Sequence, residues 1–480
     1  MRTLKTLRAV SVPPGTLHLL ADAVRSRRIS VTTLVTESIE RLERARQLNV
    51  TALTSYDEAL RVAQHLDDIG SAVGKLAGIP ILVKDLEDLK GYPTRKGSLA
   101  LRDAPPALQN GVVAGRLIDH GAIAVGKSTL PEFAIEGYTA NLLTGVTRNP
   151  WNENYSPGGS SGGSAAAVSS GLVGAATATD GGGSVRIPAS LCGLVGLKPT
   201  NGVIGRWPPP DWIDYSTDGH FASSCDDLRM LLDVTRGPVS GDPTSPQLET
   251  WARLGTEPVR IIAASRTSPL GPLDPAVASL LHDGAAALSQ RLGADLVWME
   301  PGSFFGDGDP DDDWFPVTSA EHVAAMGRDW VIAHFHEFHV ATQEYFDAGL
   351  RVTIDQYLAA RRRRYRFVKR LSSLLGPNGL LVTPSVAVPG WLADGRMNES
   401  SPIHGLSPQV YSTAVQNVTG HPAISIPFGH LANGLPFGLQ VTAPHYHDYR
   451  LIDIAALMES TYPWARTAPG YEGLESILST

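Results

Sequence analysis

The residues between Gly158 and Pro199 are unusually small, and this segment constrains the fold more than any other part of the chain. It runs from the glycines of SPGGSSGGS to the proline of GLKPT. Glycine accounts for 48 of the 480 residues, which is above its usual share of about 7%. Because glycine lets the backbone come close to another group, the segment predicts a site that the backbone itself approaches.

The flanking sequence predicts an α/β fold. Ser30 can cap a helix in which apolar residues recur at helical spacing, and we expect residues 1–70 to be helical. Short apolar runs at 79–83 and 122–125 are each followed by polar turn or helix material. This alternation is typical of strands and helices that share one core.

The composition favours an enzyme that acts on a small molecule. The formal net charge of −8 and the pI near 6.0 give no electrostatic reason to expect a nucleic acid or an anionic membrane as partner. Cys192 and Cys225 are too few for a disulfide framework or a cysteine metal site, and they suit a reducing compartment. Neither a signal peptide nor a run of about 18 apolar residues is recognisable. We therefore expect a cytoplasmic protein.

Two charged segments are predicted to be structural. Residues 361–370 are basic, but apolar residues fall at helical spacing through them, which indicates a helix with a charged, solvated face. Gly376 should end that helix, and residues 380–383 read as a buried strand. The acidic residues 307–313 are predicted to form a solvated loop.

Two motifs suggest other functions and are not favoured. GAIAVGKS, residues 121–128, matches the phosphate-loop pattern, yet residues 122–125 are themselves strand-like where that loop needs a flexible turn. GGSSGG contains overlapping GxSxG patterns centred on Ser160 and Ser161, the signature of an α/β-hydrolase with a downstream histidine such as His421. The residues before Ser160 make a poor strand, whereas a nucleophile elbow needs one.

Three further segments together indicate amide chemistry: GIPILVKD with Lys84, SPGGSSGGSAAAV with Ser160, and TDGGGSVRIPAS with Ser184. In order and spacing they resemble the amidase signature family, and the 24 residues between the two serines (184 − 160) match that family. CGLVGLKPT, residues 192–200, and the stretch 419–441 continue the resemblance, which therefore covers nearly the whole chain.

The resemblance implies a role for each of these residues. Ser184 looks like the nucleophile that accepts the acyl group, Ser160 like a bridging serine held in a cis peptide, and Lys84 like the base. The chemistry supports these roles, because a lysine among apolar residues can be neutral and can remove a proton from a serine hydroxyl.

Neighbouring residues are predicted to support the nucleophile. The backbone of Gly181, Gly182 and Gly183 can donate N–H groups to the oxyanion of the tetrahedral intermediate. Asp180 and Arg186 resemble the family's buried supporting pair, and Ser161 is expected to hydrogen-bond within the glycine loop. Two departures leave the substrate pocket open: Gly181 stands where a larger side chain is common, and residues 206–218 are rich in tryptophan and proline.

The family fold implies one domain, 1–480, with a mixed, mostly parallel twisted sheet surrounded by helices. Its expected parts are the helical residues 1–70, a catalytic core segment at 79–200, a variable substrate-side region at 201–400, and a C-terminal part of the core at 401–480.

The predicted function is hydrolysis of a carboxylic amide to an acid and an amine or ammonia. An amidotransferase subunit that delivers ammonia to a partner, or a biosynthetic acyl-transfer relative, remains an alternative. No cluster has the ligand spacing of a metal site such as HExxH, so neither a metal nor an organic cofactor is expected. The predicted partners are a small-molecule amide and a second copy of the chain in a homodimer.

Overall fold

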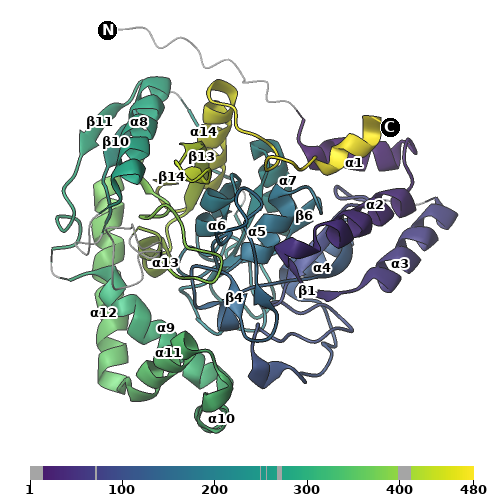
Figure 1. The fold of residues 1–480 in the computed structure, drawn as a ribbon. Coiled ribbons are helices and arrows are strands. Elements are labelled where there is room, and N and C mark those ends of the chain that lie inside the picture. Colours follow the sequence, from purple (N-terminus) through teal and green to yellow (C-terminus); the bar gives the residue numbers. More distant parts are fainter. Residues whose placement is uncertain are drawn as a thin grey trace.

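The computed structural model describes residues 14–70, 73–248, 250–255, 257–267, 273–306, 308–397 and 412–479. Parts of three predicted regions lie outside these residues: positions 1–13 of the helical N-terminal part, positions 249, 256, 268–272, 307 and 398–400 of the substrate-side region, and positions 401–411 and 480 of the C-terminal part. Strands and helices alternate along the chain, so the α/β prediction is confirmed. Figure 1 shows the helices surrounding the strands on several sides.

A small sheet of four strands carries the first part of the chain. Its order is β1 (Thr51–Thr54), β3 (Ile123–Ser128), β2 (Pro80–Lys84) and β6 (Ala175–Ala176). β2 is parallel to both β3 and β6, whereas β1 is antiparallel to β3. All five residues of β2 are buried, as expected for a strand that has a neighbour on each side and helices on its faces.

A large mixed sheet of eight described strands forms the rest of the core. Its order is β11 (Asp295–Trp298), β10 (Arg260–Ala263), β12 (Leu380–Pro384), β14 (Pro436–Thr442), β13 (Ala423–His430), β8 (Val195–Lys198), β9 (Thr217–Ala222) and β7 (Ala178–Asp180). A mixed sheet was predicted and is confirmed. The prediction that it is mostly parallel is wrong for the described strands, because only the β11–β10 and β10–β12 pairings are parallel. Hairpin-like neighbours such as β13 and β14 need only a short connection, and this makes them antiparallel.

One extended segment contributes to both sheets. β6 belongs to the small sheet and β7 to the large sheet, and Thr177 alone separates them in the sequence. Residues 175–180 are therefore the seam between the two sheets. The seam lies within the small-residue segment, and every one of its residues is buried.

The helices cover the two sheets in groups. The N-terminal helices, the smaller helices near the centre and the C-terminal helix are α1 (Thr16–Arg25), α2 (Val31–Arg44), α3 (Tyr56–Ile69), α4 (Val112–Asp119), α5 (Gly162–Ser169), α6 (Arg186–Leu191), α7 (Cys225–Thr235), α13 (Ala414–Thr419) and α14 (Asp448–Thr461). The predicted cap of α2 is confirmed, since the Ser30 side chain accepts a hydrogen bond from the Thr33 N–H.

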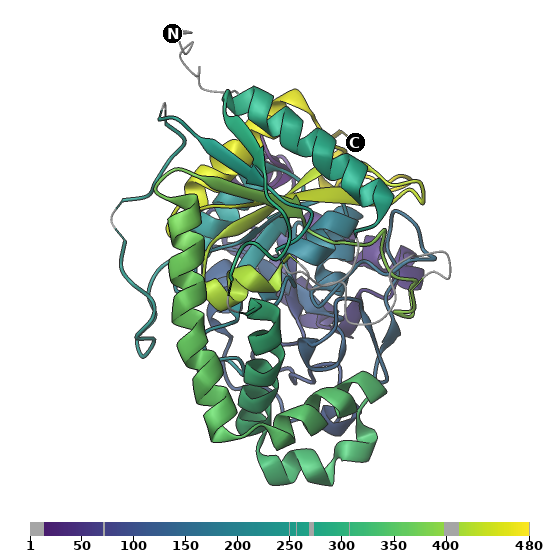
Figure 2. The ribbon, with the colours of Figure 1, turned by 90° about the vertical axis from the view of Figure 1, so that its left-hand side faces the viewer.

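The remaining helices lie between β10 and β12 in the sequence. They are α8 (Pro275–Leu292), α9 (Pro310–Met326), α10 (Arg328–Ala333), α11 (Val340–Arg351) and α12 (Ile354–Leu375). Figure 2 shows α12 as a long helix along one side, with α9, α10 and α11 gathered beside its lower part and α8 lying across the large sheet. A two-strand ribbon of β4 (Ala140–Asn141) and β5 (Gly145–Val146) completes the strands.

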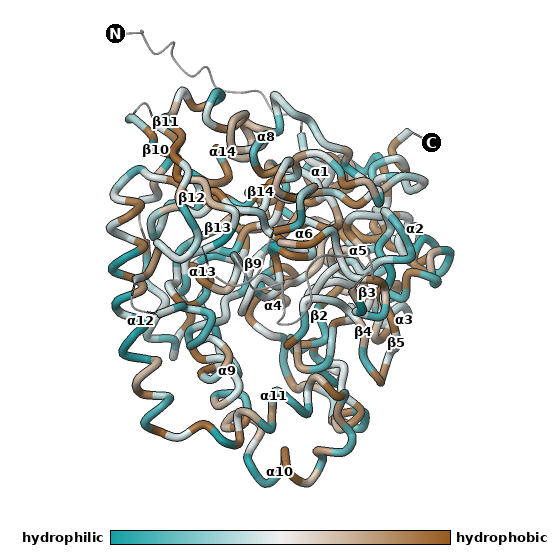
Figure 3. The backbone as a smooth tube through the Cα atoms, turned by 60° about the vertical axis from the view of Figure 1, so that its left-hand side comes forward, coloured by the Kyte–Doolittle hydropathy of each residue, from teal (hydrophilic) through white to brown (hydrophobic). Residues whose placement is uncertain are grey.

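The basic segment lies in α12, and the strand predicted after it is β12, so both expectations are confirmed. Hydrophilic and hydrophobic residues alternate along α12 (Figure 3). Its arginines are less solvated than predicted: Arg361 and Arg364 both donate hydrogen bonds to the Asp214 carboxylate. Two arginines of the helix therefore bind the loop that contains Asp214.

The acidic segment leads into a helix, so the loop prediction is wrong for residues 310–313, which belong to α9. Asp309 caps α9, its side chain accepts a hydrogen bond from the Asp311 N–H, and Pro310 is the first helical residue. Aspartates in a first turn face the positive end of the helix dipole, and proline is well suited to the first position. The aspartates and proline that suggested a loop therefore form the start of a helix.

Candidate active site

Lys84 ends strand β2 and lies beside the seam. Its Nζ is within hydrogen-bond distance of three hydroxyl oxygens: Ser160 Oγ at 2.8 Å, Ser161 Oγ at 2.9 Å and Thr179 Oγ1 at 2.8 Å. The Lys84 side chain is fully buried. Burial, partly opposed by the charges of Asp180 and Asp218, lowers the pKa of Lys84 to about 7. The lysine is therefore poised to exchange a proton near neutral pH.

Ser160 lies in the glycine loop that precedes helix α5. The peptide bond between Gly159 and Ser160 is cis, as predicted. A Cβ on Gly159 would lie 2.6 Å from the Glu136 carbonyl oxygen and 2.7 Å from that of Tyr138, so only glycine fits. The small residues predicted to let the backbone approach closely do so here.

Ser184 follows the three glycines and precedes helix α6. Its residue is 8% exposed, and it lines the same cavity as Ser160, Thr179 and Gly181. The structure therefore joins Lys84 and Ser160 by a direct hydrogen bond and places Ser160 and Ser184 on one cavity wall.

The glycine backbone differs from the prediction at one position. The Gly183 N–H donates to Asp180 Oδ1 at 2.9 Å, so this group is already engaged within the protein. The expectation that Gly181, Gly182 and Gly183 all offer N–H groups to a substrate is therefore revised for Gly183. The side chain of Asp180, three residues earlier, accepts this hydrogen bond and so forms a turn. The sequence spacing of these residues does not predict that turn.

Two side chains fix the peptide planes of the other glycines. Trp314 Nε1 donates to the Gly181 carbonyl oxygen at 2.7 Å, and Thr413 Oγ1 donates to the Gly182 carbonyl oxygen at 2.6 Å. Because a peptide plane turns as a unit, holding a carbonyl oxygen also fixes the direction of the N–H group on the next residue.

Asp180 and Arg186, on either side of Ser184 in the sequence, form a buried bidentate ion pair. Arg186 Nη2 lies 2.7 Å from Asp180 Oδ1, and its Nε lies 2.9 Å from Oδ2. Burial would raise the pKa of the Asp180 carboxyl, but the charge and hydrogen bonds of Arg186 hold it at about 2. Arg186 also donates to side-chain oxygens of Gln416, Asn417 and Gln440. Asp180 also accepts hydrogen bonds from the N–H groups of Gly183 and Val185, the two residues that flank Ser184, and its supporting role stays a prediction.

The lysine of the phosphate-loop motif has a structural partner instead. Lys127 lies in β3, and its Nζ is 2.9 Å from Asp85 Oδ1, with both side chains buried. Residues 123–128, which include Lys127, form this strand and leave no phosphate-binding turn, so the structure gives the phosphate-loop motif no support.

The nucleophile-elbow alternative finds no support in the described residues. None of residues 147–161 forms a strand before Ser160. His421 lies within hydrogen-bond distance of Ser372 Oγ at 3.1 Å, and its ring centroid is 3.8 Å from that of His445. It is not among the residues that line the cavity with Ser160.

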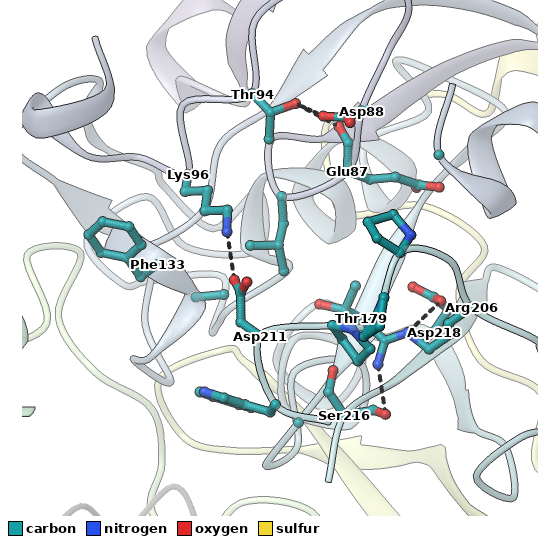
Figure 4. A pocket seen from close by; sticks show the side chains of 18 of the residues that line it. Glu87, Asp88, Thr94, Lys96, Phe133, Thr179, Arg206, Asp211, Ser216 and Asp218 are labelled. Carbon is teal, nitrogen blue, oxygen red and sulfur yellow. Dashed lines mark hydrogen bonds and ion pairs between the residues drawn. The ribbon is translucent and has the colours of Figure 1, made fainter. Parts of the chain in front are cut away.

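Ser160 and Ser184 line a cavity of about 420 Å³. Much of its wall comes from the tryptophan- and proline-rich segment 206–218, whose role the sequence left open. In Figure 4, Lys96 reaches across to Asp211 of this segment, and Arg206 bonds to Asp218 and Ser216. The Lys96 Nζ to Asp211 Oδ2 distance is 2.6 Å. The segment is therefore held over the site by charged contacts.

Sequence reasoning missed Thr179, Trp212 and Trp314. Thr179 immediately precedes the well-recognised Asp180 and lies on the seam, so strand alternation could have placed it toward Lys84. No sequence signal relates Trp314 to Gly181, because they are 133 residues apart. Trp314 reaches Gly181 only because the fold places helix α9 beside it.

Comparison with known proteins assigns the chain to a family. The family model described as Amidase matches residues 33–305 and 321–452. The chain belongs to the amidase signature family. Among the relatives of this amidase, an acylamidase from Rhodococcus erythropolis is 32% identical over 486 residues, which cover 94% of this chain and 96% of the relative.

Solved structures agree with this assignment. A bacterial aryl acylamidase of the amidase signature enzymes is 26% identical, with a TM-score of 0.84 over 94% of this chain and 96% of that chain. A 6-aminohexanoate cyclic dimer hydrolase is 28% identical, with a TM-score of 0.83 over 95% and 98%. The amidase is therefore an amide hydrolase, as predicted. No described helix is both long and apolar enough to cross a membrane.

Proposed function

We propose that this amidase cleaves a small carboxylic amide through an acyl-enzyme on Ser184, with Ser160 relaying protons to Lys84. The observation that carries the proposal is the hydrogen bond between Lys84 Nζ and Ser160 Oγ in a fully buried setting. A neutral amine donates two hydrogen bonds and accepts one. With three hydroxyls around it, neutral Lys84 can accept the Ser160 proton while donating to Ser161 and Thr179.

The proton path is then balanced at each step. Ser184 Oγ attacks the carbonyl carbon as its proton passes to Ser160 and the Ser160 proton passes to Lys84. The carbonyl π bond breaks and the oxygen becomes an anion, to which the N–H groups of Gly181, Gly182 and Ser184 would donate. When the C–N bond breaks, the proton returns through Ser160 to the leaving nitrogen. Water then cleaves the ester by the same path.

The proposal uses neither metal nor organic cofactor. Within the described parts of the chain, no group of three or more His, Cys, Asp or Glu side chains is placed to hold a metal ion. The acylamidase and hydrolase activities named for the relatives support a small amide as substrate. We place the enzyme in the cytoplasm, where buried, unpaired Cys192 and Cys225 would stay reduced.

Labelling of the nucleophile tests the proposal. A fluorophosphonate should modify Ser184, and Ser184→Ala should lose labelling and lower turnover by about 10⁴-fold or more, since the acyl-enzyme cannot form. Peptide mass spectrometry identifies the modified serine. Ser303→Ala, a change at an exposed position, serves as the control and should behave as wild type. Modification of Ser160 or Ser161 with Ser184 spared would overturn the assignment.

A further inference from the structure

Trp212 occupies the space beside Gly181 that a side chain there would need. A Cβ on Gly181 would lie 2.2 Å from Trp212 Cζ3 and 2.3 Å from Cε3, far inside van der Waals contact. The indole therefore lies directly against the backbone next to the nucleophile. Gly181 is the position at which the sequence departs from the family pattern, and the Trp212 ring lies where a side chain on residue 181 would start.

A second tryptophan holds this arrangement. Trp314 meets Trp212 edge to face, with ring centroids 5.4 Å apart and planes at 80°. The Trp314 Nε1 also donates to the Gly181 carbonyl oxygen at 2.7 Å. Because Trp212 is only 8% exposed and packs against this fixed ring, it has little freedom to leave Gly181.

The cavity wall near Trp212 is aromatic. Phe133 and His322 line the same cavity, and their rings meet edge to face at 5.4 Å and 86°. The Trp212 and His322 centroids are 6.2 Å apart. Leu101 and Met326 add apolar contacts to this wall, so a flat ring entering the cavity would meet aromatic and apolar groups.

The aromatic part of the lining, made by Trp212, Phe133 and His322, carries little net charge, although Glu87, Asp88, Arg206 and Asp218 also line the cavity. Burial lowers the pKa of His322 to about 4, so its ring is neutral at physiological pH. Its two ring nitrogens make no hydrogen bond within the described structure, although Nε2 lies 3.5 Å from Asp211 Oδ2. The Asp211 charge is balanced by Lys96. A substrate with an uncharged ring, and with a polar substituent that hydrogen-bonds to His322, therefore fits this wall better than a charged substrate does.

We infer that Trp212 forms an aromatic subsite beside Ser184, that this subsite favours amides carrying an uncharged aryl ring next to the scissile bond, and that the missing side chain of Gly181 is what admits Trp212. The inference rests on the proposed function of Ser184. Ring pairs gain stability from edge-to-face and offset contacts beyond their buried area, so an aryl ring should be preferred over a saturated ring of the same size.

Matched substrates test this preference. Benzamide is compared with cyclohexanecarboxamide, and acetanilide with N-cyclohexylacetamide, so that the ring is varied on the acyl side and on the amine side. Trp212→Ala should lower the phenyl-over-cyclohexyl ratio of kcat/KM by about three- to ten-fold in at least one pair, and Trp212→Phe should retain most of it. Trp298→Ala, on strand β11 and half exposed, is the control and should leave both ratios unchanged.

The coupling to Gly181 gives an independent measurement. Gly181→Ala alone should lower kcat/KM for every substrate by about ten-fold or more, because its Cβ would overlap the indole. In the Trp212→Ala background the same substitution should lower kcat/KM much less, because the ring that its Cβ would overlap is absent. An equal decrease in kcat/KM in the two backgrounds would show that Trp212 and Gly181 act independently and would overturn the inference.

The two proposals can fail separately. Fluorophosphonate labelling of Ser184 in Trp212→Ala reports whether the nucleophile still works. If labelling persists and both phenyl-over-cyclohexyl ratios stay at their wild-type values, the aromatic subsite is wrong while the nucleophile assignment stands. If wild-type enzyme is not labelled at Ser184, the proposed function itself fails.

Discussion

At the scale of single residues, the protonation of Lys84 governs the proposed reaction. Its three hydroxyl contacts can be made by either protonation state, but only the neutral amine can accept a proton from Ser160. Since burial lowers the pKa of Lys84 to about 7, the neutral form predominates above that pH and is lost below it. The active fraction therefore rises as the pH increases through about 7.

Substitution of Lys84 by arginine tests this dependence. A guanidinium keeps its proton at every accessible pH, so Lys84→Arg should slow acylation by about 10²-fold or more even though the charge is preserved. Single-turnover acylation measured from about pH 6 to 10 should rise through the titration of the lysine in wild type and stay flat in the variant. Near wild-type rates in Lys84→Arg would mean that another group activates Ser184.

The residues predicted from sequence are those whose chemistry depends on near neighbours in the chain. Ser160, Ser184, Asp180 and Arg186 stand in short motifs, and the ion pair spans six residues. The Trp212–Gly181 contact could not be predicted, because the resemblance fails at both positions and only the folded loop brings them together. The engagement of the Gly183 N–H depends on backbone geometry that spacing does not encode.

At the scale of elements, α12 carries a complete capping box at its start. The Thr353 side chain accepts a hydrogen bond from the Gln356 N–H, and the Gln356 side chain accepts one from the Thr353 N–H. Two backbone donors that have no partner within the helix are thereby satisfied. This helix in turn holds Asp214 and the loop above the cavity through Arg361 and Arg364.

Removal of this cap should weaken the helix measurably. Thr353→Ala is expected to lower the free energy of unfolding by about 1 kcal/mol, detected as a lower urea midpoint in circular dichroism. Thr353→Ser keeps the hydroxyl and should stay close to wild type. An unchanged midpoint in Thr353→Ala would show that packing against α9 alone sets the start of the helix.

Elements with a strong local signal were predicted from sequence, such as the cap of α2 and the end of α12. The start of α9 was not, since aspartate, glycine and proline serve loops and helix starts equally well. The parallel character of the large sheet was also mispredicted. Strand direction depends on which strands become neighbours, and residue spacing carries little information about that.

At the scale of the whole molecule, Arg186 connects parts of the chain that are far apart in sequence. Its guanidinium binds Asp180 on the seam and the amide side chains of Gln416 and Gln440 near the C-terminal strands. The arginine is fully buried, so all its partners must be in place at once.

The homodimer and the single-domain organisation remain predictions.

Loss of Arg186 should therefore destabilise the entire fold. Arg186→Met leaves Asp180 buried without its partner, and we expect a loss of about 3–5 kcal/mol, measured by urea unfolding. The double variant Asp180→Asn/Arg186→Met should lose less than the two single losses added together, because no charge is left unpaired. A single variant within about 1 kcal/mol of wild type would contradict this account.

The seam between the two sheets makes the active site observable without a substrate. The Lys84 N–H donates to Thr177 Oγ1 in the buried interior, and the lysine side chain binds Thr179 on the same segment. An amide hydrogen in such a setting exchanges with deuterium only when the surrounding structure opens. The opening that releases the Lys84 amide must also separate its side chain from the seam. Its exchange rate is therefore expected to report how often the proposed proton relay opens.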